Sequence, residues 1–521
     1  MQTAFDEGIP MNPKWWTLAA VCTGVFMLLL DVTIVNVALP DIESTFHASL
    51  SDLQWVISAY ALTLAAFLLT TGSLADLYGR RLLFATGLVV FTVGSLLCGV
   101  ATSSLFLTIA RGGQGVGGAI MFATALALLA QEFHGRERGT AFGIWGATIS
   151  VSAAVGPLLG GALTEGLGWQ SIFLINVPIG IAAAFLTMAK VTESRDPEGK
   201  RIDWIGTITF TAALFLLVLG LIRGNADGWS SPLIVSLFAA SVVLLAGFVY
   251  AESVQEHPMF DLSLFRKPTF GGASVASFAV SSAMFAMFLY LTLYIQTLLG
   301  YSPLQTGLRF LPFTVVSFFA AILSGHLTGR IPFRFLLGGG LLLVGIGLFL
   351  MRGLTPTSDW TALLAGFIVA GSGVGLVNPA LASTALGVVP PRRSGMASGI
   401  NNTFRQVGIA TGIAALGAIF ESTITNTLGP HLTGTPAAGK AAQIAHAVAG
   451  GGTQAVLHSV PRADRAQASA AIHVAFTSAM NDILLVAGII ATAGAVLAVI
   501  LVRARDFAAY GAPEAAAAAA A

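Results

Sequence analysis

Long apolar stretches alternate with short polar segments along the whole chain. A helix needs roughly 20 apolar residues to cross the hydrocarbon core of a bilayer. Fourteen stretches reach this length, at about residues 16–39, 53–75, 82–101, 105–131, 139–164, 170–190, 204–222, 232–252, 270–297, 306–327, 334–352, 360–381, 397–420 and 480–503. The pattern predicts an all-α integral membrane protein with fourteen transmembrane helices.

Most of the 25 Lys and Arg residues fall in alternate polar segments, on the side of the predicted spans where both termini lie. Basic loops stay on the cytoplasmic side when a membrane protein is inserted. We therefore expect a multi-pass protein of the cell membrane, plasma or inner, with both termini in the cytoplasm. Residues 1–15 are then a cytoplasmic tail, and residues 504–521 are a second, low-complexity tail that is mostly alanine.

Two short glycine patterns recur eight predicted spans apart. Gly72-x-Leu after the second span returns as Gly325-x-Leu after the tenth. Gly113-Gln-Gly-Val-Gly in the fourth span returns as Gly371-Ser-Gly-Val-Gly in the twelfth. Internal repeats are common in transporters. They predict two pseudo-symmetric six-helix bundles, at residues 16–190 and 270–503, with two inserted helices in the linker 191–269 and a long external loop at 421–479.

The composition narrows the class of protein. Hydrophobic residues make up 55% of the 521 positions and charged residues 9%, whereas an ordinary soluble domain has about 25% charged residues. The net charge of +1 gives no indication of nucleic-acid binding. The sequence contains no metal-binding pattern, no nucleophile–base set and no complete phosphate-binding loop. We therefore expect no cofactor, no metal and no enzymatic activity.

Asp31 is the most informative polar residue, because it interrupts the apolar stretch from Leu28 to Pro40 in the first span. An acid in hydrocarbon costs about 2.5–3.5 kcal/mol on insertion scales and marks a functional site by default. If the first helix ends before Pro40, Asp31 lies about 12 Å below its outer end. Arg111 lies about 10 Å deep in the fourth span. The two are natural partners for proton coupling, with a purely structural ion pair as the alternative.

Two further segments predict contacts that change during a conformational cycle. The first is a short cytoplasmic loop that contains Asp76, Gly79, Arg80 and Arg81. We expect its charges to pair between helices and to separate when the protein opens inward. Gly79 permits the tight turn. The fifth span carries small residues four apart and a proline, which let helices approach closely and bend. We expect this helix to lie against the opposite half, and the residues concerned are Gly156, Pro157, Gly160 and Gly161.

These segments resemble patterns of the major facilitator superfamily. The loop Gly72-x-Leu-Ala-Asp-x-x-Gly-Arg-Arg and the fourth-span segment Leu107-x3-Arg-x2-Gln-Gly-x-Gly are similar to two of its patterns. Gly156-Pro-x2-Gly-Gly resembles its antiporter pattern, and Leu30 to Pro40 resembles the first span of the fourteen-helix drug:proton antiporter group (QacA/EmrB-like). The resemblance implies alternating access and export driven by the proton gradient. It also implies Asp31 as the protonation site and Arg111 as its relay neighbour.

The second half departs from that group. Some relatives carry additional acids in the tenth and thirteenth spans, where this chain has Arg309 and Arg405. Arg405 either attracts an anionic group or ties helices together. Other aromatic and amide residues in the spans are candidates for a substrate cavity, since aromatic faces suit a lipophilic cation. With Arg405, the cavity candidates are Asn36, Tyr60, Gln114, Trp145, Phe285, Tyr290, Tyr294, Phe313 and Asn378.

The sequence therefore predicts a proton-coupled secondary transporter that exports small amphipathic or lipophilic compounds, preferably cations, as in multidrug efflux and antibiotic resistance. We expect a monomer surrounded by membrane lipid, with protons and small molecules as its partners. A dedicated exporter of one metabolite, amino acid or lipid is the alternative. A membrane receptor that transports nothing is a third interpretation.

Overall fold

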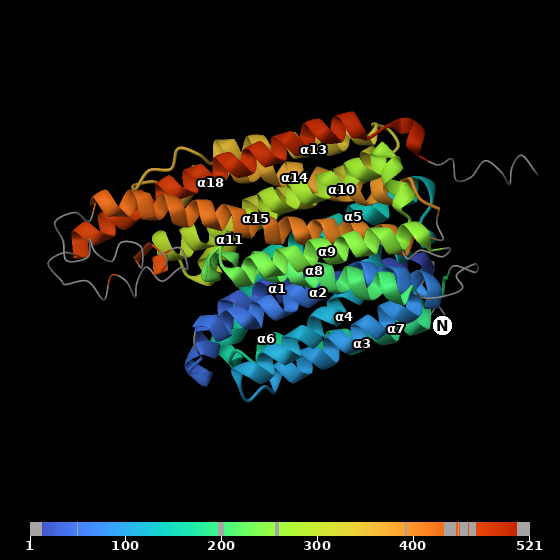
Figure 1. Cartoon of the computed structure of the whole chain (residues 1–521), viewed down its shortest axis with the longest axis horizontal. Coiled ribbons are helices and arrows are strands. Elements are labelled where there is room, and N and C mark those ends of the chain that lie inside the picture. Colours follow the sequence, from blue (N-terminus) through green and yellow to red (C-terminus); the bar gives the residue numbers. More distant parts are fainter. Residues whose placement is uncertain are drawn as a thin grey trace, which may run out of the picture.

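The computed structural model consists of long helices that run side by side along one axis (Figure 1). It describes residues 13–48, 50–195, 203–255, 260–390, 393–431, 444–445, 447–448, 457 and 465–507. The first helix begins and the last long helix ends at the same end of the bundle, which we call the terminal end. The opposite end, where α15 stops and α18 starts, is the loop end. The long apolar stretches of the sequence form helices, because a helix satisfies its backbone hydrogen bonds internally in a membrane.

The N-terminal half is a group of helices whose first member starts at the terminal end. Its helices are α1 (Pro13–Phe46), α2 (Leu50–Tyr78), α3 (Arg80–Gly99), α4 (Ser104–Glu132), α5 (Gly135–Leu167), α6 (Ser171–Leu174) and α7 (Asn176–Lys190). The short α6 and α7 together form one span, broken at Ile175 between them.

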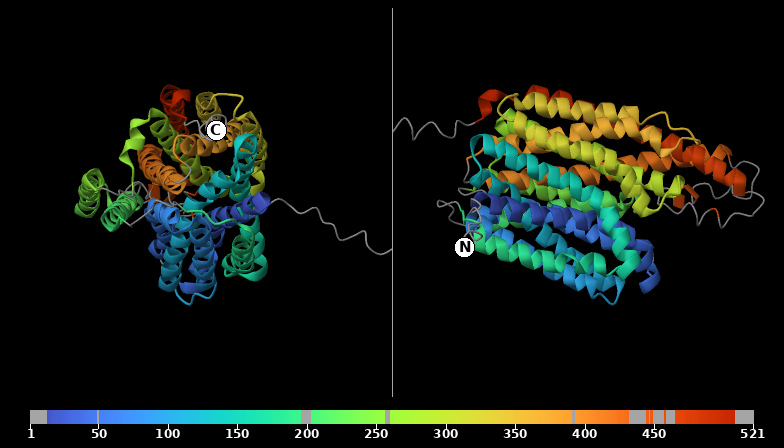
Figure 2. Two further views of the ribbon diagram at one scale, coloured as in Figure 1. Left: turned by 90° about the vertical axis from the view of Figure 1, so that its right-hand side faces the viewer. Right: turned by 180° about the vertical axis from the view of Figure 1, so that it is seen from behind.

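Two inserted helices and the C-terminal half follow. The inserted helices are α8 (Trp204–Asp227) and α9 (Pro232–Val254), which pair at the edge of the bundle (Figure 2, left). A short segment, η1 (Leu262–Arg266), leads into the C-terminal half. Its elements are α10 (Pro268–Val280), η2 (Ser281–Phe285), α11 (Ala286–Leu293), η3 (Tyr294–Leu298), α12 (Pro303–Leu327), α13 (Phe333–Leu350), η4 (Trp360–Leu363), α14 (Leu364–Gly387), α15 (Ser394–His431), α18 (Arg465–Leu501) and η7 (Ala504–Asp506).

The predicted fold class is confirmed. In the described part of the chain, 13 helical segments are long and apolar enough to cross a membrane. The segment from α10 to η3 counts as one of them, although the wider π-helical turns η2 and η3 interrupt it. The 33-residue α5 lies between α1 of one half and α12 of the other, and completes the expected set.

Large apolar side chains cover the outside of the bundle. Phe185 is 76% exposed, Tyr250 72% and Val243 69%. Apolar patches of this kind on a protein surface indicate contact with another apolar phase. The helix lengths and the apolar exterior together describe a multi-pass membrane protein.

The first helix does not end before Pro40, as the sequence suggested, but continues to Phe46. Proline disfavours a helix interior because it lacks the backbone N–H, yet contacts beyond it support the last turns. The Phe46 ring lies 5.4 Å from that of Trp169, and Trp169 Nε1 donates to Thr45 Oγ1 at 3.1 Å. Asp31 consequently lies about 22 Å from the end of α1, fifteen residues before Phe46 at roughly 1.5 Å each.

The two halves meet most closely at the terminal end and diverge toward the loop end (Figure 2, right). Near the terminal end, Gly139 of α5 faces Gly325 of α12 so closely that a Cβ on either would overlap the other's carbonyl oxygen. Gly72 of α2 faces Gly395 of α15 at similar range. Glycine permits this backbone contact because it has no side chain. At these two points the halves touch through main chain.

We predict that Gly325→Ala separates the halves at the terminal end, because the new Cβ collides with rigid backbone. Pulsed EPR between spin labels at His134 and Arg330, exposed positions beside α5 and α12, should give longer distances than in the parent protein. The matched control is Gly339→Ala on α13, where a Cβ meets no atom within 4 Å. Equal distances in the two variants would contradict the claim that this glycine contact limits closure.

Candidate functional site

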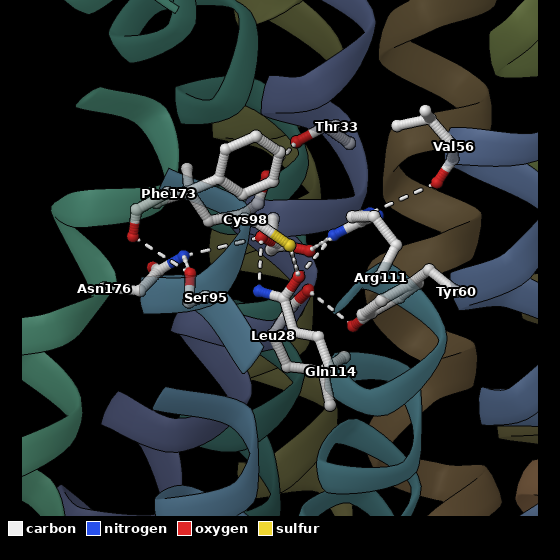
Figure 3. A network of polar contacts seen from close by, with 12 residues as sticks. Leu28, Thr33, Val56, Tyr60, Ser95, Cys98, Arg111, Gln114, Phe173 and Asn176 are labelled. Carbon is white, nitrogen blue, oxygen red and sulfur yellow. Dashed lines mark hydrogen bonds and ion pairs between the residues drawn. The ribbon is translucent and has the colours of Figure 1, made fainter. Parts of the chain in front are cut away.

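An ion pair buried inside the N-terminal half is the centre of the candidate site (Figure 3). Asp31 projects from α1, and Arg111 projects from α4. Arg111 Nη1 donates to Asp31 Oδ2. Asp31 is 0% exposed and Arg111 1% exposed. The depth argument from the sequence therefore identified two residues that are in direct contact.

Gln114 closes a ring around this ion pair. Its Nε2 donates to Asp31 Oδ1 at 2.9 Å, and its Oε1 accepts from Arg111 Nη1 at 2.7 Å. Arg111 and Gln114 lie three residues apart on α4, so a single face of that helix presents both. Because Gln114 donates to the acid and accepts from the base, it fixes the relative orientation of the two charged groups.

Two other helices complete the carboxylate's surroundings. Asn176 Nδ2 on α7 donates to Asp31 Oδ1 at 3.4 Å and to Ser95 Oγ on α3 at 3.1 Å. Ser95 in turn donates to the Phe173 carbonyl at 2.9 Å. Asn176 reaches the site because it is the first residue of α7, directly after the break in the sixth span. Helices α1, α3, α4 and α7 therefore all contribute to one polar cluster.

Arg111 has further contacts that hold its guanidinium in place. Its Nε donates to the Val56 carbonyl of α2 at 3.3 Å, and its Cζ lies 4.2 Å from the centre of the Tyr60 ring. Cys98 Sγ also approaches Gln114 Oε1 at 3.7 Å. The arginine is thus held by a carboxylate, an amide, a carbonyl and an aromatic face, which is what a buried cation requires.

The chemistry available here is a change of charge in a place that water does not reach. With Asp31 ionised, the ion pair is neutral overall. With Asp31 protonated, the charge of Arg111 is left without its counter-charge, and an unpaired buried charge is strongly unfavourable. Proton binding at Asp31 therefore favours any conformation that gives Arg111 another partner.

Asp76 lies where the two halves meet at the terminal end. Its Oδ1 accepts from Arg80 Nε at 2.9 Å and Nη2 at 2.7 Å within its own half. The same carboxylate accepts from the backbone N–H groups of Gly395 (2.9 Å) and Met396 (2.8 Å) in the other half. These N–H groups belong to the first turn of α15 and have no partner inside that helix, so Asp76 satisfies them.

The rest of the predicted loop pattern stays within the N-terminal half. Gly79 has a φ of 116°, a conformation that side chains rarely adopt. Glu193, which the sequence did not single out, accepts from the Arg81 backbone N–H at 3.0 Å and pairs with its side chain at 3.6 Å. Arg80 additionally donates to Gln131 at 3.0 Å. Only Asp76 of this pattern bonds across the halves among the described contacts.

The inserted segment is also connected to the start of α15. Arg393 donates to Asp261 Oδ2, and the Ser263 backbone N–H donates to Asp261 Oδ1 at 2.9 Å. Burial raises the pKa of Asp261, but these hydrogen bonds and the charge of Arg393 outweigh it and lower the pKa below its usual value. The linker between the halves is therefore attached to the same helix terminus that Asp76 caps.

The glycines of α5 pack differently from the expectation. Gly156 faces Thr33 and Gly160 faces Ile34, both on α1 of the same half. Gly161 has its nearest neighbour across the halves, with a Cβ position 3.9 Å from Leu304. The helix does lie against the opposite half, but through its earlier residues rather than this segment. The side chain of Pro157 lies outside the described residues.

The predicted cavity residues divide into three groups. Tyr60 and Gln114 belong to the Asp31 cluster. Three others lie inside the C-terminal half. There Tyr290 donates to the Ile413 carbonyl at 2.7 Å, Tyr294 to the Ser358 carbonyl at 3.3 Å, and the Phe313 ring packs 4.9 Å from Phe288. The remaining group, Trp145, Phe285, Asn378 and Arg405, lies along the boundary between the halves. The side chain of Asn36 is outside the described residues.

None of these candidates lines a hollow that lies between the halves. That cavity of about 190 Å³ is bordered by α1, α5 and α12. Its walls are apolar apart from Thr148, and they comprise Phe26, Ile144, Ala147, Thr148, Val151, Phe318 and Ile322. The sequence analysis missed these residues because apolar side chains in a span give no signal of the direction they face.

The polar members of the cluster that were missed did leave a signal. Asn176 is an amide in an apolar stretch two residues before Pro178, and it resembles Asn378 before Pro379, which the sequence analysis did single out. Buried amides are costly unless they are bonded. An amide beside a proline in a membrane span therefore indicates a buried polar site, as an acid does. Ser95 and Cys98 are too common in such helices to be recognised.

Comparison with known proteins agrees with this architecture. The multidrug resistance protein Stp of Mycobacterium tuberculosis (strain CDC 1551 / Oshkosh) is 40% identical over 417 residues, covering 80% of this chain and 78% of its own. The probable actinorhodin transporter of Streptomyces coelicolor is 35% identical over 427 residues, covering 79% and 73%.

Solved structures support the fold at lower identity. A human organic anion transporter superposes with a TM-score of 0.60 at 15% identity, covering 92% of this chain and all of its own. A bacterial homologue of the human lysosomal transporter Spinster, in an inward-facing and unoccupied conformation, gives 0.58 at 18% identity, covering 96% and 100%.

A family profile identifies the chain as a whole. The profile of the Major Facilitator Superfamily matches residues 21–413, which include every residue of the Asp31 cluster and the Asp76 contact. Membership of a transporter family also confirms the interpretation that the chain is not an enzyme. The chain belongs to the Major Facilitator Superfamily.

Proposed function

We propose that this protein exports small amphipathic compounds across the cell membrane in exchange for protons. The observation that carries the proposal is the buried pair of Asp31 and Arg111, since a fully enclosed carboxylate and guanidinium suit a site that changes charge. The relatives named as a multidrug resistance protein and a probable actinorhodin transporter support the direction and the kind of substrate.

We assign the terminal end to the cytoplasm, because the basic segments lie there and basic loops remain inside. With that assignment, the structure is closed toward the cytoplasm by the glycine contacts and by Asp76 at the start of α15. Opening inward requires these contacts to break. Backbone contacts between glycines are suited to this, because no interdigitated side chains have to be withdrawn.

The proposed cycle begins with a proton that reaches Asp31 from the outside. Protonation of Asp31 leaves the charge of Arg111 without its counter-charge. The conformational equilibrium then shifts toward a state in which Arg111 has another partner. Asp31 is enclosed on all sides in this structure, so proton entry requires α1 or the Arg111 side chain to move first. Return of the proton to the cytoplasm restores the ion pair.

One carboxylate of this kind implies few protons per cycle. A single proton moving inward across 100 mV supplies about 2.3 kcal/mol. At roughly 1.4 kcal/mol per tenfold change, that free energy supports about fiftyfold accumulation before the pH gradient is added.

A dedicated exporter of one metabolite is the second candidate. The relatives named for actinorhodin and for tetracenomycin C export each carry a single compound in their names. Measuring efflux from proteoliposomes loaded in turn with several unrelated dyes distinguishes a multidrug exporter from a dedicated one. A multidrug exporter moves most of the dyes, and a dedicated exporter moves few or none.

We predict that Asp31→Asn abolishes uphill efflux in proteoliposomes with an imposed pH gradient. The amide cannot take up a proton, so substrate binding persists while the gradient no longer drives transport. Proton release on substrate addition to the purified protein should also disappear. The control is Asp227→Asn, an acid that pairs only with Arg223 on its own helix among the described contacts. Uphill efflux by the Asp31 variant would refute the central role of this carboxylate.

We also predict that substitutions of Arg111 and Asp31 change the free energy of unfolding in a non-additive way. Arg111→Met removes one partner of a buried pair and should lower the free energy of unfolding by about 3–5 kcal/mol. Adding Asp31→Asn should recover part of that loss, because no unpaired charge is then buried. Denaturation of the purified variants measures both values. If the double variant loses the sum of the two single losses, the residues do not interact as an ion pair.

A further inference from the structure

Arg405, a further buried arginine, lies between the halves and pairs with no acid among the described residues. Arg405 is eleven residues into α15, about 16 Å from the terminal end of that helix, and is 4% exposed. It forms no ion pair with a carboxylate in the described part of the chain, unlike Arg111 at the other buried site. A cation at this depth is unfavourable unless something compensates its charge.

Aromatic rings from both halves surround this guanidinium. Arg405 Cζ lies 4.6 Å from the centre of the Phe285 ring in η2 and 6.0 Å from that of Phe122 in α4. Phe122 is stacked against Trp145 of α5, with ring centres 6.4 Å apart and planes inclined by 25°. Ring faces stabilise a cation only in part. They also form walls against which a flat ligand can stack.

Several buried polar atoms in helices near this guanidinium have no protein partner among the described residues. Trp145 Nε1, both amide atoms of Asn378 and Asn401 Nδ2 are buried and have no hydrogen-bond partner within the described residues. Trp145 and Asn378 are ten and nine residues from the terminal ends of their helices, about 15 Å and 14 Å respectively. Their neighbours Gly146 and Pro379 are in contact across the halves. Asn401 lies one turn before Arg405 on α15.

Buried donors normally find partners inside the protein. The nearby Asn402 does so, since its Nδ2 donates to the Phe122 carbonyl at 3.1 Å. Trp145 stacks on Phe122, which lies over Arg405, so at least one of the unpartnered atoms belongs to the same aromatic group as the arginine. The unpartnered atoms match a binding site whose partners come from a ligand.

We propose that Arg405 is the charge-selecting residue of the substrate site, and that the site takes flat aromatic compounds carrying one acidic group. The guanidinium offers several N–H donors in a plane, which suits a carboxylate or an acidic phenol. The rings of Phe285 and Phe122 receive the aromatic part of the ligand, and the free amides receive its neutral oxygens. A monoanion neutralises the buried charge, whereas a cation increases it.

This inference rests on the proposed export function for its meaning, but its test requires no transport. It reverses the preference for cations that the sequence suggested. The order of affinity follows from the single unpaired charge, with an anion bound best, its neutral analogue less well and its cationic analogue least.

The test uses three probes of one shape: naphthalene-2-carboxylate, naphthalene-2-carboxamide and 2-naphthylmethylammonium. Calorimetry at neutral pH measures their Kd values on the purified full-length protein, before and after single substitutions. The carboxylate should bind about tenfold or more tightly than the carboxamide, as expected for a hydrogen bond to a charged group. The ammonium probe should bind more weakly than both.

Arg405→Gln should bring the carboxylate and carboxamide affinities to within about twofold of each other, while carboxamide binding, which also reports correct folding, is retained. Arg405→Lys should keep a smaller preference for the anion, because the charge remains and the planar donors are lost. Arg309→Gln is the control, since Arg309 bonds to the Gln305 carbonyl at 2.9 Å and lies over Tyr301.

Two results would overturn the inference. One is that the wild-type protein binds the carboxylate no more tightly than the carboxamide. This measurement does not depend on whether any variant folds. The other is an anion preference that survives in Arg405→Gln. Failure of proton-driven efflux with an intact anion preference would instead refute the export function alone.

Discussion

The structure depends on one constraint, which is that neither Asp31 nor Arg111 can be buried alone. An unpaired charge of either sign in the low-dielectric interior is costly, so each residue requires the other at contact distance. Gln114 and Asn176 add the directional bonds that an ion pair by itself lacks. The result ties α1, α3, α4 and α7 into one unit. A change of charge at the proposed proton site would therefore act on four helices of the N-terminal half together.

The contact between the halves follows the opposite principle. It includes glycine backbone at the terminal end, a hydroxyl pair between Ser150 and Ser317 at 2.7 Å, and the Asp76 carboxylate on the first turn of α15. None of these three contacts requires a large side chain to be withdrawn from a core when it breaks. A rigid half moving against another through such a surface is what alternating access requires. The bonded cluster within the N-terminal half and the separable contacts between the halves are therefore both suited to alternating access.

The sequence was sufficient for the features that depend on local composition. Span length and apolar content identified the helices, and depth along two spans suggested that Asp31 and Arg111 meet. It was insufficient wherever the direction of a side chain decided the outcome. The end of α1 was misplaced because Trp169, far along the chain, supports the turns beyond Pro40. Tyr60 was expected in a cavity but stacks on Arg111. Lateral packing of helices is non-local, and hydropathy carries no information about it.

In the proposed cycle, Arg111 and Arg405 have different consequences for energy coupling. Arg111 is neutralised within the protein, so its site exchanges charge only when a proton arrives. Arg405 has no ion-pair partner among the described residues, and in the proposed site the substrate supplies its counter-charge, so the charge of the substrate enters the cycle. Exchange of one proton for a monocation moves no net charge, and only the pH gradient and the substrate gradient matter. Exchange of one proton for a monoanion moves two positive charges inward, and the membrane potential then acts twice. If Arg405 binds the substrate as proposed, this one buried cation sets both the charge that is recognised and how strongly the membrane potential drives export.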